Sequence, residues 1–264
     1  MEIDVNLGKL PQKEKGSLEI IECKTIEEKR RHGLERLASG FRTFSHFGFD
    51  EGVAGHITFR DPEFEHHFWV NPFGMHFGQI CVSDLVLVDR NGEVVIGDRP
   101  VNTAAFAIHS RLHEARPDVN AAAHSHSMYG KSFSSMGRKL EPITQDSCAF
   151  FEDHVLFDDF TGVVLETDEG DRIANALGDK RAAILKNHGL LTTGETVDAA
   201  VWGFLSMDRC CQSQMIAESV GQMERIPDET AAMTKEQVGS ELGMWVMYQP
   251  IYDLMLEKDD SFLN

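Results

Sequence analysis

Three histidines in two apolar segments have the residue type and spacing that a metal ion would use. His124 and His126 lie two residues apart in the run AAAHSH, which we interpret as a buried strand, so both imidazoles should point to the same face. His188 ends a second apolar run, in KNHGLL, and we expect Gly189 to let the chain turn away sharply while the ring faces inward. Unpaired imidazoles on a buried strand would be costly, whereas a divalent metal binds neutral imidazole nitrogens. The same spacing is compatible with hydrogen-bonded core histidines, which is the alternative to a metal site.

A metal held by three protein ligands would keep open coordination positions, which is typical of a catalytic rather than a structural site. Such an ion could polarise a carbonyl or enediolate oxygen of a substrate. The histidine pattern therefore favours metal-assisted chemistry on a small oxygen-bearing compound.

The composition excludes several other classes of protein. A chain of 264 residues with 42% hydrophobic content can bury a sizeable core in one large or two small domains. The net charge of −18 repels phosphate backbones, so nucleic acid and anionic membranes are not expected as partners. No apolar run approaches the ~18 residues of a membrane helix, and the first twenty residues lack the apolar middle of a signal peptide, so we expect a cytoplasmic protein. Five cysteines without a CxxC pair indicate reduced thiols rather than a disulfide framework or a zinc ribbon.

The elements that must position the histidines alternate between helix and strand. The spacing predicts helices over 25–48, 102–116, 128–136, 167–177 and 196–222, and a last one from Thr234, which has capping-box spacing with Gln237. Strands are expected between 52 and 97, with a hairpin turn at Asn91-Gly92, and at VNAAAHSH, GVVLE and AAILKN. We therefore divide the chain into a flexible tail (1–24), a main domain (25–225) and a C-terminal helical extension (226–264).

Five motifs in a fixed order resemble the class II aldolase and adducin amino-terminal domain family. They are GVAGHITFRDP, VNPFGMHFGQICVSDLVLVD, AAFAIHSRLHEARPDVNAAAHSHS, FDDFTGV and LKNHGLLTTGETVDAA. The resemblance implies a three-layer α/β/α sandwich with a largely antiparallel central sheet, and a homotetramer with sites at subunit boundaries. It also implies that His124, His126 and His188 are ligands of Zn²⁺ or of another divalent metal such as Fe²⁺ or Mn²⁺.

The sequence departs from the aldolase pattern at the groups that move protons. Ala105 stands where aldolases of this family have an acidic residue, and Phe157 falls where they have a tyrosine. Proton-transfer groups typically contribute about 10²–10⁴-fold each, so a standard retro-aldol mechanism would lose much of its rate. Thr103 and Ala104 replace the phosphate-binding serines, so a phosphorylated sugar is not the expected substrate.

Other residues are candidates for substrate binding or proton transfer. His56 follows the glycine-rich substrate loop of the family, and together with Asn102 and Thr103 it is expected to bind substrate. The candidates for acid or base catalysis are Tyr129, Asp146 and His154.

Three classes of function remain open. The leading hypothesis is a metal-dependent carbon–carbon lyase, aldolase-like or decarboxylase-like, acting on a small hydroxy or keto compound. A non-haem iron oxygenase is a second, because three histidines without a carboxylate leave positions for oxygen and substrate. The third is an adducin-like interaction domain or a pseudoenzyme that keeps its metal, although the short acidic end EKDDSFLN differs from the lysine-rich tail of animal adducins.

Overall fold

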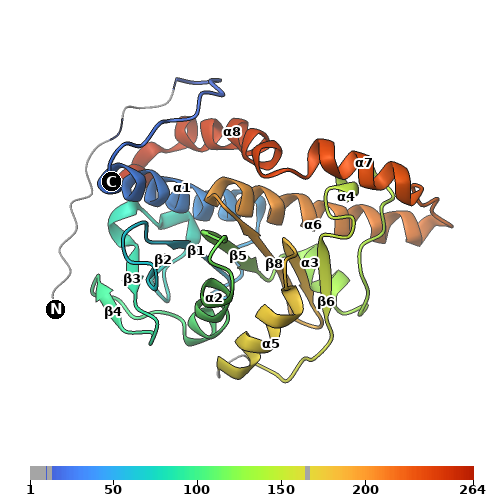
Figure 1. Cartoon of the computed structure of the whole chain (residues 1–264), viewed down its shortest axis with the longest axis horizontal. Coiled ribbons are helices and arrows are strands. Elements are labelled where there is room, and N and C mark those ends of the chain that lie inside the picture. The colour runs from blue at the N-terminus through green and yellow to red at the C-terminus, as the bar shows by residue number, and fades with distance from the viewer. Residues whose placement is uncertain (1–9, 11–13, 164–166) are drawn as a thin grey trace.

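The computed structural model describes residue 10 and residues 14–163 and 167–264, and its centre is a sheet of eight strands. The strand order is β4-β3-β2-β1-β5-β8-β7-β6, and all neighbours are antiparallel except β6 and β7. Helices cover both faces, which confirms the predicted three-layer α/β/α architecture with a largely antiparallel sheet (Figure 1). The strands are β1 (His56–Arg60), β2 (Phe68–Val70), β3 (Val86–Val88), β4 (Val94–Ile96), β5 (Ala121–Ser125), β6 (His154–Phe157), β7 (Ala182–Leu185) and β8 (Gly189–Gly194).

The long helices lie on one side of the sheet. They are α1 (Ile26–Phe47) and α6 (Val197–Val220), which contact the strands, and α8 (Glu241–Lys258), which packs on α1 and α6. All three contribute to the larger hydrophobic core. The predicted start of α1 is confirmed, because Thr25 and Glu28 form a capping box, and Gly48 ends the helix with φ of 76°.

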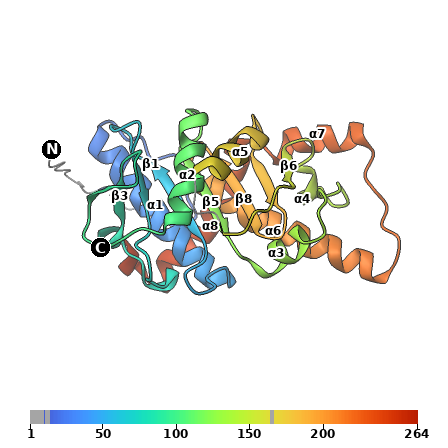
Figure 2. The same cartoon turned by 90° about the horizontal axis from the view of Figure 1, so that it is seen from below.

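Two shorter helices cover the opposite face. They are α2 (Thr103–Ala115) and α5 (Thr167–Leu177), which Figure 2 shows side by side over the strands. A second core cluster, which includes Ile108, Ile173 and Leu191, lies between these helices and the sheet. The remaining helices are α3 (Met128–Ser134), α4 (Gln145–Cys148), α7 (Asp228–Val238) and the 3₁₀ turns Phe77–Gln79, Val82–Asp84 and Asp260–Leu263.

The C-terminal helices differ from the sequence expectation. Thr234 does not begin a helix but lies inside α7, where its hydroxyl donates to the Thr230 carbonyl. The last long helix begins instead after Ser240, whose hydroxyl accepts from Gly243 N at 3.0 Å. Its Tyr248 is fully buried against α1, but the domain boundaries drawn after residues 24 and 225 stay predictions.

The sequence analysis did not predict the strands β6 and β8, and the turn beside His188 is made by a different residue than expected. The expected strand at 162–166 includes residues 164–166, which lie outside the described part of the chain, while the strand before α5 is β6. The left-handed residue of the turn is Asn187, with φ of 59°, so the prediction that Gly189 makes the turn was wrong. Gly189 instead begins β8, where a Cβ atom would lie 2.8 Å from the Ser125 carbonyl oxygen. Glycine is needed there for close approach of two backbones.

All five cysteines are unpaired, as expected. Among the described residues, no helix combines the length and apolar character needed to cross a membrane.

Candidate metal centre

Three imidazoles converge where the neighbouring central strands β5, β8 and β7 end or begin. His124 is near the end of β5, His126 follows that strand, and His188 follows the end of β7 just before β8 begins. The ring centroids of His124 and His188 are 4.6 Å apart, and those of His126 and His188 are 4.9 Å apart. One nitrogen from each ring lies within 4.8 Å of the other two. The structure therefore brings together the three histidines that the sequence singled out.

Hydrogen bonding and burial prepare His124 to bind a cation. Its Nδ1 lies 2.7 Å from the Leu190 carbonyl oxygen, which can only accept, so Nδ1 carries the proton and Nε2 keeps its lone pair. A backbone carbonyl that orients an imidazole in this way is a common feature of metal sites. Burial and the adjacent His188 keep the pKa of His124 well below its ordinary value. The ring is therefore neutral near pH 7, as a metal ligand must be.

The other two rings are half-buried and also neutral. Burial, with His126 nearby, lowers the pKa of His188 to about 4. Burial and the Lys131 ammonium lower the pKa of His126, while Glu51, which pairs with Lys131, partly opposes them. Three neutral imidazoles with partial access to solvent fit a divalent ion that accepts nitrogen ligands.

Two further histidines extend the cluster into the protein. His56 begins β1 and pairs with His124 across the sheet, and the two ring centroids are 5.1 Å apart. His109 of α2 packs against His56 with ring centroids 4.2 Å apart. Both nitrogens of His56 and Nε2 of His109 are buried without a hydrogen-bond partner in the part of the chain that the structure describes.

The sequence prediction included His56 but missed His109. The available signal was the spacing of His109 and His113, which are four residues apart and so share one face of a helix. The polar partner of that face, Thr58, comes from a distant segment and could not be recognised from helix periodicity.

The other predicted substrate-binding residues lie at the start of α2. Asn102 Nδ2 donates to the Val53 carbonyl at 3.4 Å and so contacts the loop that leads to His56. Thr103 is an exposed residue in the first turn. The structure ties Asn102 to the segment before His56, and substrate binding by Asn102 and Thr103 stays a prediction.

Of the three candidates for acid or base catalysis, His154 and Asp146 are not part of the three-histidine cluster. His154 is the first residue of β6. Its Nε2 accepts from Leu140 N at 3.0 Å, and its Nδ1 donates to the Phe150 carbonyl at 2.6 Å. Tyr129 is half-buried against the larger core, and Asp146 lines a cavity of about 460 Å³ beside Trp202. His154 in particular has no free nitrogen for proton transfer.

The two departures from the aldolase pattern fall in α2 and β6. Phe157 ends β6 and is buried in the core cluster beneath α2 and α5. A phenylalanine ring offers no proton there. Ala105 belongs to the first half of α2, and its side chain lies outside what the structure describes.

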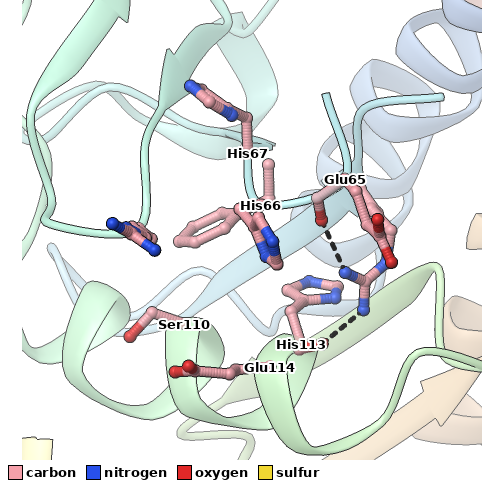
Figure 3. Close-up of a pocket in the computed structure, with 9 residues that line it drawn as sticks. Glu65, His66, His67, Ser110, His113 and Glu114 are labelled. Carbon is pink, nitrogen blue, oxygen red and sulfur yellow. Dashed lines mark hydrogen bonds between the residues drawn. The ribbon is translucent and has the colours of Figure 1, made fainter. Parts of the chain in front are cut away.

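A small surface pocket lies beside His113. Figure 3 shows Ser110, His113 and Glu114 of α2 on one side and the loop with His66 and His67 on the other. Arg60 fixes this arrangement by donating to the carbonyl oxygens of Glu65 and His113. The cavity measures about 40 Å³, which has room for water rather than for an organic substrate.

The chain is similar to several known proteins along most of its length. The family model described as Class II Aldolase and Adducin N-terminal domain matches residues 35–215. The chain is 49% identical over 237 residues to "Decarboxylase NovR" of Streptomyces niveus, covering 89% of this chain and 88% of that protein. It is 48% identical, with 89% and 86% covered, to "4-hydroxy-3-prenylphenylpyruvate oxygenase/4-hydroxy-3-prenylbenzoate synthase" of Streptomyces roseochromogenus subsp. oscitans. Among solved structures, "L-fuculose 1-phosphate aldolase from Glaciozyma antarctica PI12" superposes with a TM-score of 0.85 and 44% identity, covering 91% of this chain and 94% of that one.

Proposed function

The chain belongs to the class II aldolase and adducin N-terminal domain family, and from this premise we propose that it is a divalent-metal-dependent carbon–carbon lyase. The proposed reaction is of the decarboxylase type on a small hydroxy or keto acid. The observation that carries the proposal is the convergence of His124, His126 and His188, with His124 held by a backbone carbonyl.

The residues of the chain have separate tasks in this proposal. His124, His126 and His188 would hold Zn²⁺ or another divalent ion such as Fe²⁺ or Mn²⁺. The ion would act as a Lewis acid that polarises a substrate oxygen. His56 lies directly beside His124 and would contact the bound substrate, and Asn102 would hold the loop that precedes it.

Decarboxylation fits the side chains better than aldol cleavage does. In aldol cleavage one fragment must be protonated or deprotonated by a positioned group, and Phe157 cannot do either. Carbon dioxide leaves without a proton, and the remaining fragment needs only one proton later, which solvent can supply. The relative whose name reads "Decarboxylase NovR" supports the same choice.

An oxygenase is the second candidate. The cluster consists of three imidazoles and includes no carboxylate, so a ferrous ion there would keep positions for oxygen and substrate. The relative named as a prenylphenylpyruvate oxygenase and prenylbenzoate synthase supports this alternative. Iron in the purified protein and a requirement for oxygen would favour the oxygenase, whereas zinc and oxygen-independent turnover would favour the lyase.

The deciding experiment measures metal content and carbon dioxide release together. The purified protein is analysed for metals, stripped with a chelator and reloaded separately with Zn²⁺, Fe²⁺ or Mn²⁺. We expect about one ion per chain and release of carbon dioxide under nitrogen from a 3-keto acid such as benzoylacetate, because the ion-bound carbonyl oxygen can accept the electron pair as an enolate. The 2-keto acid 4-hydroxyphenylpyruvate lacks that acceptor and serves as the comparison under nitrogen and under oxygen. Release only in the presence of oxygen would support the oxygenase, and no release with any metal would contradict both candidates. A chelator that unfolds the protein would indicate a structural metal.

We also propose that the protein forms a homotetramer with its sites near subunit boundaries, as the family resemblance implies. Exposed apolar side chains support an interface: Leu242 and Met247 are 58% and 50% exposed and line the 460 Å³ cavity beside α6. Light scattering after size-exclusion chromatography would measure the assembly, and a monomer at all concentrations would contradict it. The cytoplasmic location stays a prediction from the sequence.

A further inference from the structure

A series of hydrogen bonds joins two histidines of α2 through Thr58 and leads toward the candidate metal centre. Thr58 of β1 is fully buried, and its Oγ1 lies 2.7 Å from His109 Nδ1 and 2.9 Å from His113 Nε2. The other nitrogen of His113, Nδ1, lies 3.3 Å from the Val119 carbonyl oxygen. His109 then contacts His56, which lies beside His124.

The Val119 carbonyl fixes the direction of every bond in this chain. A carbonyl can only accept, so His113 must donate from Nδ1, and a neutral imidazole carries a single N–H. His113 Nε2 must therefore accept a hydrogen bond, and the Thr58 hydroxyl donates its single proton to it. Thr58 Oγ1 then accepts from His109 Nδ1, which leaves His109 Nε2 without a proton. Burial supports the neutral form of His113, because it lowers the pKa of that ring to about 3.

The end of the chain that faces the metal centre must be an acceptor. His109 Nε2 has no partner among the described residues, and the neighbouring His56 ring has none at either nitrogen. If His56 donates its single N–H to His109, the remaining nitrogen of His56 is again a lone pair. The result is the same whether His109 or His56 forms the end.

We propose that the His113–Thr58–His109 chain, with His56 beside it, presents a buried lone pair that binds a hydroxyl group of the substrate. The proposal rests on the lyase function above, and it adds where the functional groups of the substrate lie. A hydroxyl can donate to this lone pair, whereas a carboxylate or phosphate oxygen only accepts and would be repelled. The carboxylate of a hydroxy acid must therefore lie elsewhere in the site. Thr58 and His113 act as positioning residues, since neither reaches the substrate itself.

The first test reads the tautomers directly in the full-length protein supplemented with Zn²⁺, which is diamagnetic. Nitrogen-15 NMR of histidine-labelled protein should show His109 protonated at Nδ1 and bare at Nε2, and His113 protonated at Nδ1. Assignment would use His109→Gln and His113→Gln. In Thr58→Val the His109 tautomer should change, because its acceptor is gone, while Thr58→Ser should keep the wild-type spectrum. A proton on His109 Nε2 in the wild type would overturn the proposal.

The second test measures the preference for a hydroxyl without any turnover. Binding of mandelate is compared with that of phenylacetate, and 4-hydroxyphenylpyruvate with phenylpyruvate, since each pair differs by one hydroxyl. We expect at least one hydroxylated member to bind about tenfold or more tightly to the wild type and to Thr58→Ser, and the preference to fall to about twofold in Thr58→Val. Equal binding within both pairs, no binding of any acid, or an undiminished preference in Thr58→Val would overturn the hydroxyl assignment. This test measures binding alone and does not depend on catalysis. Failure of the lyase proposal would appear instead in the carbon dioxide assay, as acids that bind but release no carbon dioxide.

Discussion

The buried polar groups at the two ends of β1 differ in how completely they are hydrogen-bonded. Just after the strand ends, the Asp61 carboxylate accepts from Arg30 at 2.7 and 2.9 Å and from the Trp69 indole at 2.8 Å, as well as from two backbone amides. Where the strand begins, both nitrogens of His56 are buried without a partner among the described residues. The same strand thus carries a fully paired cluster at one end and an incompletely paired cluster at the other.

This difference separates a structural role from a binding role. Removing one partner of a buried ion pair typically costs about 3–5 kcal/mol, whereas an unsatisfied buried polar group costs about 1–3 kcal/mol until something binds it. The Asp61 cluster therefore stabilises the fold. The unpaired histidine cluster lowers the free energy of unfolding, and a bound ion and substrate would raise it again.

The largest effect should come from breaking the paired end. We expect Asp61→Ala to lower the free energy of unfolding by about 3–5 kcal/mol, because Arg30 would stay buried without its partner. Urea unfolding measures this loss. Glu63→Gln is the matched control: Glu63 also pairs with Arg30, but its side chain is 45% exposed, and its loss should cost less than about 1 kcal/mol. Equal losses in both variants would contradict the distinction between the two ends of the strand.

The second effect concerns the histidine end and should appear in metal binding. We expect His124→Ala to weaken metal affinity by about 100-fold or more, since even residues that only orient a ligand contribute about 10–100-fold. Competition with a metal indicator measures the affinity. His154→Ala is the control, because both of its nitrogens bond to the backbone and it should lose stability but keep metal affinity. Unchanged metal content in His124→Ala would remove the site from β5.

The two ends of β1 should also lose their contributions to the free energy of unfolding in different pH ranges. The pKa of buried His113 is about 3 in the folded protein, against about 6.5 when unfolded, so only the unfolded chain takes up a proton between these values. Stability is full above pH 6.5 and falls by up to about 1.4 kcal/mol per pH unit for each such ring as the pH drops below it. Burial alone would raise the pKa of Asp61, but bonds from Arg30 and Trp69 hold it below its usual value, so its contribution is lost only at lower pH, below about 3.9.

Urea unfolding at pH 7, 6 and 5 with a chelator present tests this ordering. His32→Gln is the comparison variant, because burial lowers the pKa of His32 to about 4. Removing this ring should reduce the slope of unfolding free energy against pH by up to about 1.4 kcal/mol per pH unit, which corresponds to one proton. Stability that stays constant from pH 7 to pH 5 would show that the buried histidines accept protons in the folded state.

Many of the helices and strands and the three converging histidines could be predicted because their signals are local, whereas the three-layer arrangement was implied by the family resemblance of five ordered motifs. The alternation in AAAHSH marks β5, and the Thr25 capping box marks the start of α1. Other features depend on distant partners. The strand β6 is only four residues long and begins with a histidine, and it is a strand because it pairs with β7. Thr234 has the spacing of a cap, but α7 already begins at Asp228.

The acceptor chain shows the same limit of sequence reasoning. His109 and His113 share a helix face, yet their proposed role depends on Thr58, which bonds to both from β1, a strand that packs directly against α2. No periodicity in one segment contains that information. The direction of the bonds follows only when the Val119 carbonyl is placed at the far end.

The pairing of β8 with β5 has a consequence for how the protein acquires its ion. His126 and His188 are separated along the chain by all the elements from α3 to β7, and they meet only because β8 lies against β5. A newly made or unfolded chain offers only the close pair His124 and His126. On the proposed assignment, the polypeptide folds first and is loaded with the cation afterwards, so metal supply in the cell determines the active fraction of folded molecules and not the rate at which they form.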